Sequence, residues 1–153
     1  MDESEAHSTL PSGTVTFLFT DIEGSTKLLE RIREDFRAVI SEHNALFRAA
    51  FAKWNGREIQ FLGDGFHAAF RRATDAVACV AELQRELAEH VWPANATVRV
   101  RMGLNTGEAE VDSDHYVASA CTVRRGLPPP GTAGRCCSRR RRVTWSTWIY
   151  PPA

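Results

Sequence analysis

The last quarter of this chain lacks acidic residues. The 153 residues include 19 Asp and Glu, and none of them follows Asp114. Arginines continue through this region, with four in a row at Arg139–Arg142. The formal net charge of zero therefore hides an acidic body and a basic end, and the two parts do not resemble products of one design.

The chain also lacks an apolar run long enough to cross a membrane. Its first residues, Met1–Glu5, are acidic, the opposite of a secretory or mitochondrial targeting segment, so we expect a cytoplasmic protein. The four cysteines have neither zinc-binding spacing nor an obvious disulfide partner, and we expect reduced, structurally passive thiols. The length suits one domain with its own core.

What the sequence does contain is a strand signal that ends on an acid. Val15–Thr20 is a β-branched and aromatic run of strand length, and it leads into Asp21. Gly24 and Ser25 follow, and Ser25 is placed to cap a new helix. Amide groups at that helix start would face outward, where they can hold phosphate oxygens. We therefore expect a phosphorylated ligand with a divalent metal.

A second acid, Asp64, lies between two apolar runs in a pattern typical of a hairpin turn, with Arg57–Gln60 and Gly65–Phe70 as its arms. Carboxylates on neighbouring strand ends suit Mg²⁺, which takes few protein oxygens and leaves positions for substrate phosphates. Singly, Asp21 reads as a helix-capping acid and Asp64 as a turn former. Their matched positions favour a shared metal site.

Helical spacing covers two long segments. Thr26–Trp54 predicts an amphipathic helix that is broken near Glu34–Asp35, with His43 among its surface positions. A second helix begins at Thr74. Its predicted apolar face consists of Val77, Val80, Ala81, Leu83 and Leu87, with Cys79 on the same side.

Strand patterns complete the body. Thr97–Leu104 alternates as a half-exposed strand, Asn105–Gly107 predicts a turn, and Glu108–Val111 predicts a short returning strand. The resulting order is βαββαβ, an α+β fold with two helices on one face of a mostly antiparallel, ferredoxin-like sheet. No helix covers the open face of such a sheet, so we expect a second copy to cover it in a homodimer.

These patterns divide the chain into three parts. Residues 1–12 are polar and expected to be disordered, residues 13–120 form the domain, and residues 121–153 form a basic tail without usable periodicity. The tail's arginines and tryptophans are the one hint of nucleic-acid binding. The acidic body opposes that interpretation, so we expect no nucleic-acid partner and no membrane contact.

Three segments resemble the successive motifs of the class III nucleotidyl cyclase catalytic domain. They are Phe19–Thr26, Gly63–Phe66 and Arg101–Gly107, in the family's order and spacing. The resemblance covers roughly Gly13 to Tyr116. It implies a homodimer that converts ATP or GTP into the 3′,5′-cyclic nucleotide and pyrophosphate, through attack of the 3′ hydroxyl on the α-phosphate, in intracellular signalling.

The resemblance also assigns roles to individual residues. Asp21 and Asp64 match the two aspartates that bind Mg²⁺ or Mn²⁺, and Ile22 matches the position whose backbone carbonyl helps to hold the second metal. The helix start supplies the expected phosphate contacts of the substrate, from Gly24, Ser25 and Thr26.

Other positions depart from the family. Gln60 stands where many adenylate cyclases have the lysine that reads adenine, and its amide can face either purine because it both donates and accepts hydrogen bonds. His115 stands where the family usually has an aspartate or threonine that contacts the base, and Ala118 replaces a glycine. The choice between ATP and GTP is therefore open.

The catalytic asparagine and arginine of the family fall at Thr122 and Gly126, which cannot perform the same chemistry. Because those groups act across the dimer interface, each site would lose them, and we expect a weak or inactive enzyme. With suitable codons, a shift of the reading frame by one base restores family-like residues both here and at Gly131–Ser138. We therefore infer a frameshift near Cys121, which accounts for the arginine-rich tail.

Two other functions compete with a working cyclase. A noncatalytic cyclase-like module, which dimerises or binds nucleotide without turnover, fits the altered tail. A haloacid-dehalogenase-type phosphatase also has a strand ending in Asp-x-acid-Gly and a later Gly-Asp-Gly. Here its second acid would be Glu23, and the acid expected shortly after Gly65 is absent.

Overall fold

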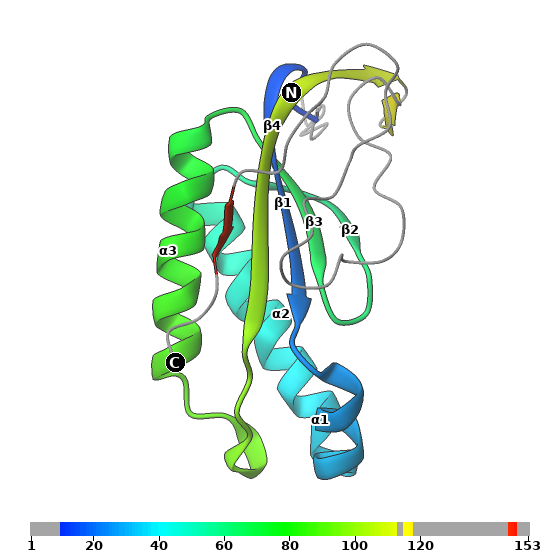
Figure 1. The fold of residues 1–153 in the computed structure, drawn as a ribbon, viewed down its shortest axis with the longest axis vertical. Coiled ribbons are helices and arrows are strands. Elements are labelled where there is room, and N and C mark those ends of the chain that lie inside the picture. The colour runs from blue at the N-terminus through cyan, green and yellow to red at the C-terminus, as the bar shows by residue number, and fades with distance from the viewer. Residues whose placement is uncertain (1–9, 113–114, 118–146, 150–153) are drawn as a thin grey trace, which may run out of the picture.

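A computed structural model of the protein describes residues 10–112, 115–117 and 147–149, and Figure 1 shows their arrangement. Short 3₁₀ helices cover Arg33–Asp35 and Pro93–Asn95. The helices and strands follow in the order β1 (Gly13–Ile22), α1 (Ser25–Ile32), α2 (Phe36–Lys53), β2 (Arg57–Phe61), β3 (Phe66–Phe70), α3 (Ala73–Glu89), β4 (Val100–Asp112), β5 (His115–Val117) and β6 (Thr147–Ile149).

The strands form one antiparallel sheet in the order β2-β3-β1-β4-β5, and β6 also pairs with β4. Helices α2 and α3 lie side by side on one face of this sheet (Figure 1). The βαββαβ order and the α+β fold class are confirmed. The long first helix is also broken where the sequence predicted, at Arg33–Asp35.

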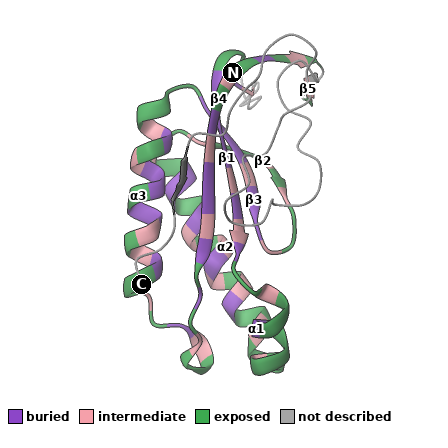
Figure 2. Cartoon of the chain, in the orientation of Figure 1, coloured by how far each residue is buried: buried purple, intermediate pink, exposed green. Residues whose placement is uncertain are grey.

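Strand β1 divides the apolar residues between the two faces of the sheet because alternate side chains point to opposite sides. Leu18 and Ile22 belong to the large core beneath the helices, whereas Val15 and Phe17 belong to a smaller cluster on the open face. In Figure 2 the buried stripes of α2 and α3 face the sheet. The helix-side core includes the fully buried Val39, Phe47, Phe66, Phe70, Val80, Leu83, Val100 and Met102.

Two predictions about the helices were wrong in detail. His43 is fully buried rather than exposed, because it lies on the side of α2 that packs on the sheet. Its ring packs at a tilt against Phe47 and stacks on Phe66. Val77 is exposed, so the buried face of α3 is rotated relative to the predicted one. That face consists of Ala76, Cys79, Val80, Glu82, Leu83 and Leu87.

The predicted turn at Asn105–Gly107 does not exist, because β4 continues through it as one 13-residue strand. The reason is the length of β1, whose residues pair with β4 from Gly13 to Ile22 and hold the turn-like tripeptide extended. The hydroxyl groups of Thr16 and Thr106 lie 2.8 Å apart across this pairing. Tertiary pairing therefore overrides the local turn preference.

Strand β6 pairs Thr147–Ile149 with Met102–Leu104 of β4. The sheet thus includes three residues of the segment that the sequence placed outside the packed domain. Within the described ranges, no helix is both long and apolar enough to cross a membrane.

Candidate metal and nucleotide site

The hairpin of β2 and β3 approaches β1 closely at Gly65. A Cβ atom there would lie 1.9 Å from the carbonyl oxygen of Thr20, so only glycine fits. Two hydrogen bonds use this approach. The Phe66 amide donates to Thr20 Oγ1 at 2.8 Å, and the Ile22 amide donates to the Asp64 carbonyl oxygen at 3.0 Å. Asp64 is thereby held beside the end of β1, which carries Asp21.

The segment after β1 turns at once into α1. Gly24 has φ 64° and ψ 35°, a left-handed conformation that favours glycine, and its carbonyl accepts the Leu28 amide at 2.9 Å. Ser25 was predicted to cap this helix, but α1 has no side-chain cap. The Ser25 hydroxyl instead donates to Asp64 Oδ2 at 2.7 Å. Ser25 therefore orients the second acid, and Thr26 next to it is exposed.

Asp21 has a cationic partner. It pairs in register with Arg101 of β4, whose Nε donates to Asp21 Oδ2 at 3.1 Å and whose Nη2 donates to the same oxygen. The two side chains are 22% and 30% exposed, so water screens their attraction only in part. The sequence analysis quoted Arg101 in a motif but gave it no role.

These residues fit a magnesium or manganese site. Asp21 and Asp64 offer the hard carboxylate oxygens that Mg²⁺ prefers. Within residues 10–112 and 115–117, no three His, Cys, Asp or Glu side chains converge to hold a metal. Two carboxylates leave coordination positions for a ligand's phosphate oxygens, as is usual for Mg²⁺ at nucleotide sites.

A row of side chains crosses the open face beside this junction. Gln60 is exposed and pairs in register with His67, and His67 pairs with Phe19. The register of β2 shifts between Glu58 and Gln60. The rings of His67 and Phe19 stack with centroids 4.3 Å apart. Desolvation by burial lowers the pKa of His67 to about 4, so the ring is neutral at pH 7.

His67 was missed by sequence reasoning. The alternation along β3 could have found it, because Phe66 and Ala68 point into the helix-side core and the residue between them must point the other way.

His115 lies far from this row within one chain. It pairs with Asp112 at the opposite end of β4 from Arg101, across about 35 Å of extended strand. The two other catalytic positions, Thr122 and Gly126, lie outside the described residues. One chain therefore brings together Asp21, Ile22 and Asp64, with Ser25 beside them, and leaves His115 apart.

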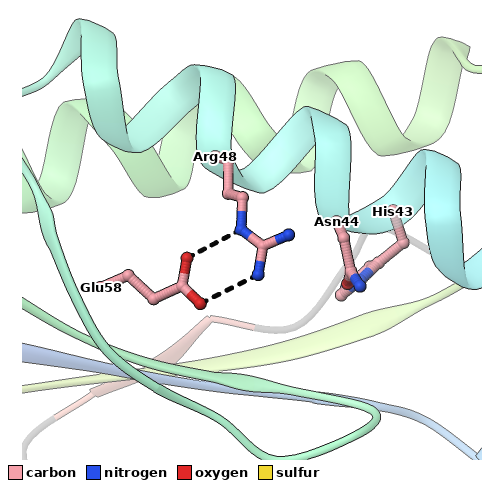
Figure 3. A network of polar contacts seen from close by, with 4 residues as sticks. All are labelled: His43, Asn44, Arg48 and Glu58. Atoms are coloured by element: carbon pink, nitrogen blue, oxygen red, sulfur yellow. Dashed lines mark hydrogen bonds and ion pairs between the residues drawn. The ribbon is translucent and has the colours of Figure 1, made fainter.

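A polar network on α2 lies on the helix side of the hairpin (Figure 3). Arg48 of α2 donates through Nε and Nη2 to the carboxylate of Glu58 on β2, at 2.9 and 3.0 Å. His43 Nδ1 lies 3.0 Å from Asn44 Oδ1, and its buried Nε2 has no hydrogen-bond partner. Desolvation lowers the pKa of His43, while Asn44 and the charge of Asp64 oppose that shift. The ring thus acts mainly as packing behind the hairpin.

Residues 8–117 match the adenylate and guanylate cyclase catalytic domain family. The chain belongs to this family. Family membership confirms that the three motifs are those of a nucleotidyl cyclase domain. It decides against the haloacid-dehalogenase-type phosphatase. The two strand-end acids and the tight Gly65 junction are therefore features of a cyclase-type domain.

Relatives and solved structures agree with this membership. An uncharacterized protein of Mycobacterium tuberculosis is 38% identical over 109 residues, which cover 70% of this chain and 36% of that protein. This chain thus matches about a third of that relative's length.

Two solved cyclases share the fold. An adenylate cyclase from Trypanosoma brucei, solved in its monomeric state, has a TM-score of 0.67 at 22% identity and covers 72% of this chain and 66% of its own. The guanylate cyclase domain of RhGC from Catenaria anguillulae, solved with GTP, has a TM-score of 0.59 at 16% identity, covering 90% and 65%.

Proposed function

We propose that this cyclase domain binds ATP or GTP together with Mg²⁺ or Mn²⁺, and that its conversion of the nucleotide to cyclic nucleotide and pyrophosphate is weak or absent. The observation that carries the binding half is the junction at Gly65, which holds Asp21 and Asp64 at adjacent strand ends. The start of α1 follows directly, so backbone amides are available to phosphate oxygens.

Each group of the junction has a distinct task in this proposal. The carboxylates of Asp21 and Asp64, with the Ile22 carbonyl, would hold the metal ions. The metal would supply positive charge that favours deprotonation of the 3′ hydroxyl and stabilises the departing pyrophosphate. Arg101 provides a guanidinium in contact with Asp21, and its planar fork suits phosphate oxygens.

Other parts of the chain would contact the purine base and stabilise the transition state. Gln60 is exposed on the open face and would contact the purine, with its amide compatible with adenine or guanine. His115 lies too far along β4 to join the same chain's metal site. In a homodimer, His115 of one copy could face the acids of the other copy, so that Gln60 and His115 would serve the same nucleotide.

Weak turnover is expected from positions 122 and 126. Thr122 retains a hydroxyl for the ribose, but Gly126 leaves no cation beside the phosphate as negative charge develops. An arginine that acts on phosphoryl transfer is worth roughly 10³ to 10⁵ in rate. We infer that a frameshift near Cys121 removed it, and that residues 13–120 are the part of the chain belonging to the cyclase.

The test is calorimetry with a nonhydrolysable ATP or GTP analogue, with and without Mn²⁺, followed by an assay for cyclic nucleotide. We expect metal-dependent binding that Asp21→Asn abolishes, while the exposed Asp35→Asn, a matched change on the 3₁₀ helix, leaves it unchanged. Equal binding by wild type and Asp21→Asn would remove the site from Asp21.

The assay separates the cyclase from the noncatalytic module. A chain in which the shifted-frame sequence replaces residues 122–153 is expected to form cyclic nucleotide far faster than the chain as given. Rapid turnover by the unaltered chain would overturn the roles given to Thr122 and Gly126. Nucleotide binding without turnover in either chain would favour a noncatalytic nucleotide-binding module.

A further inference from the structure

Strand β5, which carries His115, is a short strand at the edge of the described sheet. Its three residues, His115–Val117, pair with Glu110–Asp112 of β4. Figure 2 shows β5 beside the far end of β4, away from the helices. Because two short strands alone are marginally stable in water, the orientation of β5 depends on contacts made by its side chains.

Tyr116 makes contacts of this kind at both ends of its side chain. Its ring packs edge-on against Phe17 of β1, with ring centroids 5.0 Å apart and an interplanar angle of 82°. Its hydroxyl donates to the carbonyl oxygen of Pro11 at 2.8 Å. Burial raises the pKa of Tyr116 to about 12, so the hydroxyl keeps its proton at neutral pH and remains a donor.

The register of the sheet explains why Tyr116 meets a residue 105 positions earlier in the chain. Gly13 at the start of β1 pairs with Ala109 of β4, so the residues before Gly13 lie at the end of β4 that carries β5. Pro11 is buried there, and its carbonyl oxygen is a fixed backbone acceptor. Tyr116 therefore ties β5 to the chain segment that leads into β1.

This attachment decides which way His115 faces. Successive side chains of a strand point to opposite faces. The ring of Tyr116 belongs to the apolar cluster on the open face, so the side chain of His115 points away from that cluster. His115 is accordingly exposed.

We propose that Tyr116 is a positioning residue: by fixing β5 to Phe17 and Pro11, it directs His115 away from its own chain and toward the nucleotide bound by a second copy. This inference rests on the proposed function, which gives His115 a contact with that nucleotide. It adds the residue that holds His115 in place.

The hydroxyl is the part of Tyr116 that distinguishes positioning from packing. An apolar ring alone would fill the space against Phe17, and phenylalanine would serve equally well. A hydrogen bond to a fixed backbone oxygen adds a directional restraint on β5. A side chain that is restrained before binding loses less conformational entropy when the ligand arrives, so the restraint should appear as nucleotide affinity.

The first experiment measures amide hydrogen exchange at residues 115–117 in the full chain without ligand. In Tyr116→Phe we expect exchange to be roughly 2- to 10-fold faster than in wild type, the usual net worth of one hydrogen bond. Tyr116→Ala, which also loses the ring, should show a larger increase. Thr14→Val is the matched control, because it removes another hydroxyl at the start of β1, which donates to Glu108 at 2.7 Å, and should leave β5 unchanged.

The second experiment is a double-mutant cycle on the affinity for the nonhydrolysable ATP or GTP analogue with Mn²⁺. Tyr116→Phe should weaken binding roughly 2- to 10-fold in the wild-type background. In the His115→Ala background the same substitution should have no further effect, because the residue that it positions is absent. Thermal unfolding of each variant verifies that it is folded.

The outcomes separate this inference from the proposed function. If wild type binds the metal–nucleotide complex and Tyr116→Phe matches Thr14→Val in both experiments, the positioning role is wrong and the proposed function stands. Weakening of equal size with and without His115 would also overturn the role, because Tyr116 would then act by another route. If wild type binds neither nucleotide at any Mn²⁺ concentration, the proposed function fails and the positioning role fails with it.

Discussion

The two faces of the sheet are built from different chemistry although they share the same strands. Beneath the helices, Leu18, Phe66 and Met102 are fully buried among other apolar side chains. On the open face, the same strands present Asp21, Arg101 and His67 beside a small apolar cluster. One face therefore stabilises the fold by burial of large apolar surface, and the other carries the groups that can bind a charged ligand.

The difference shows how one strand serves both purposes. Successive residues of β1 alternate between the core and the open face, so Ile22 packs in the core while Asp21 accepts a hydrogen bond from Arg101 on the open face. The two faces meet at Gly65, where the hairpin that carries Asp64 touches the backbone of β1. A change at that junction should affect stability and binding together. A change on one face should affect mainly one of them.

The largest effect is expected from Gly65→Ala. The added Cβ would lie 1.9 Å from the Thr20 carbonyl oxygen, a backbone atom that cannot yield without disturbing β1. We expect a loss of about 3 to 5 kcal/mol in the free energy of unfolding, together with loss of metal-dependent nucleotide binding. Urea unfolding and calorimetry measure the two effects.

Gly107→Ala is the matched control for that change. Gly107 also lies in the sheet, on β4, but a Cβ there meets no atom within 4 Å. We expect its stability to remain within about 0.5 kcal/mol of wild type. Equal losses in the free energy of unfolding from the two substitutions would show that the close approach of Gly65 to Thr20 does not hold the hairpin against β1.

The second expected effect is a pH dependence of stability that arises from His67 on the open face. His67 has a folded-state pKa of about 4, below the ordinary value of 6.5, so the unfolded chain takes up the proton first as pH falls. Its contribution to stability is complete above pH 6.5 and is lost as pH falls toward 4, by roughly 2 to 3 kcal/mol. Replacing His67 with Phe removes this contribution.

Urea unfolding of wild type and His67→Phe between pH 4 and 7.5 measures it. The difference in unfolding free energy between the two proteins should shift in favour of His67→Phe as the pH falls below 6.5. It should be constant between pH 7 and 7.5, which serves as the internal control. A pH-independent difference throughout the range would contradict the buried, neutral state of His67.

The smallest effect is expected from Ser25→Ala, which removes the hydroxyl that donates to Asp64 Oδ2. The acid stays in place but loses its orienting partner, and such losses weaken metal affinity by about 10-fold or more. Ser25→Thr keeps a hydroxyl and should restore most of the affinity. Stability should change little, because Ser25 is only partly buried at the surface of α1. Unaltered Mn²⁺-dependent binding in Ser25→Ala would deny it a positioning role.

Local patterns predicted most of the elements. The β-branched run before Asp21 forms β1, the break near Glu34 separates α1 from α2, and Asp64 lies in the turn of a hairpin. Strand alternation and helical spacing express which side of each element is apolar, and burial of that side is the main force that orders the chain. Asp21 and Asp64 could be proposed as metal ligands for the same reason, because an acid beside a buried strand stands out in the sequence.

Other features were decided by contacts between distant segments. Asn105–Gly107 has the composition of a turn but extends because β1 is long enough to pair with it. His43 looks polar in the helical pattern and is buried because α2 turns that side toward Phe66. Ser25 orients Asp64 rather than capping α1. Local preferences of a few tenths of a kcal/mol to about 1 kcal/mol cannot resist such long-range packing.

The sequence by itself determined the βαββαβ order and named the two acids, because both depend on neighbouring residues and on the period of each element. Only the tertiary structure decided how the acids are partnered. Arg101 is 80 residues from Asp21 along the chain, and Ser25 is 39 residues from Asp64. No local pattern encodes such pairs. They arise from the register of β1 with β4 and from the close approach at Gly65, where the absence of a side chain allows two backbones to meet.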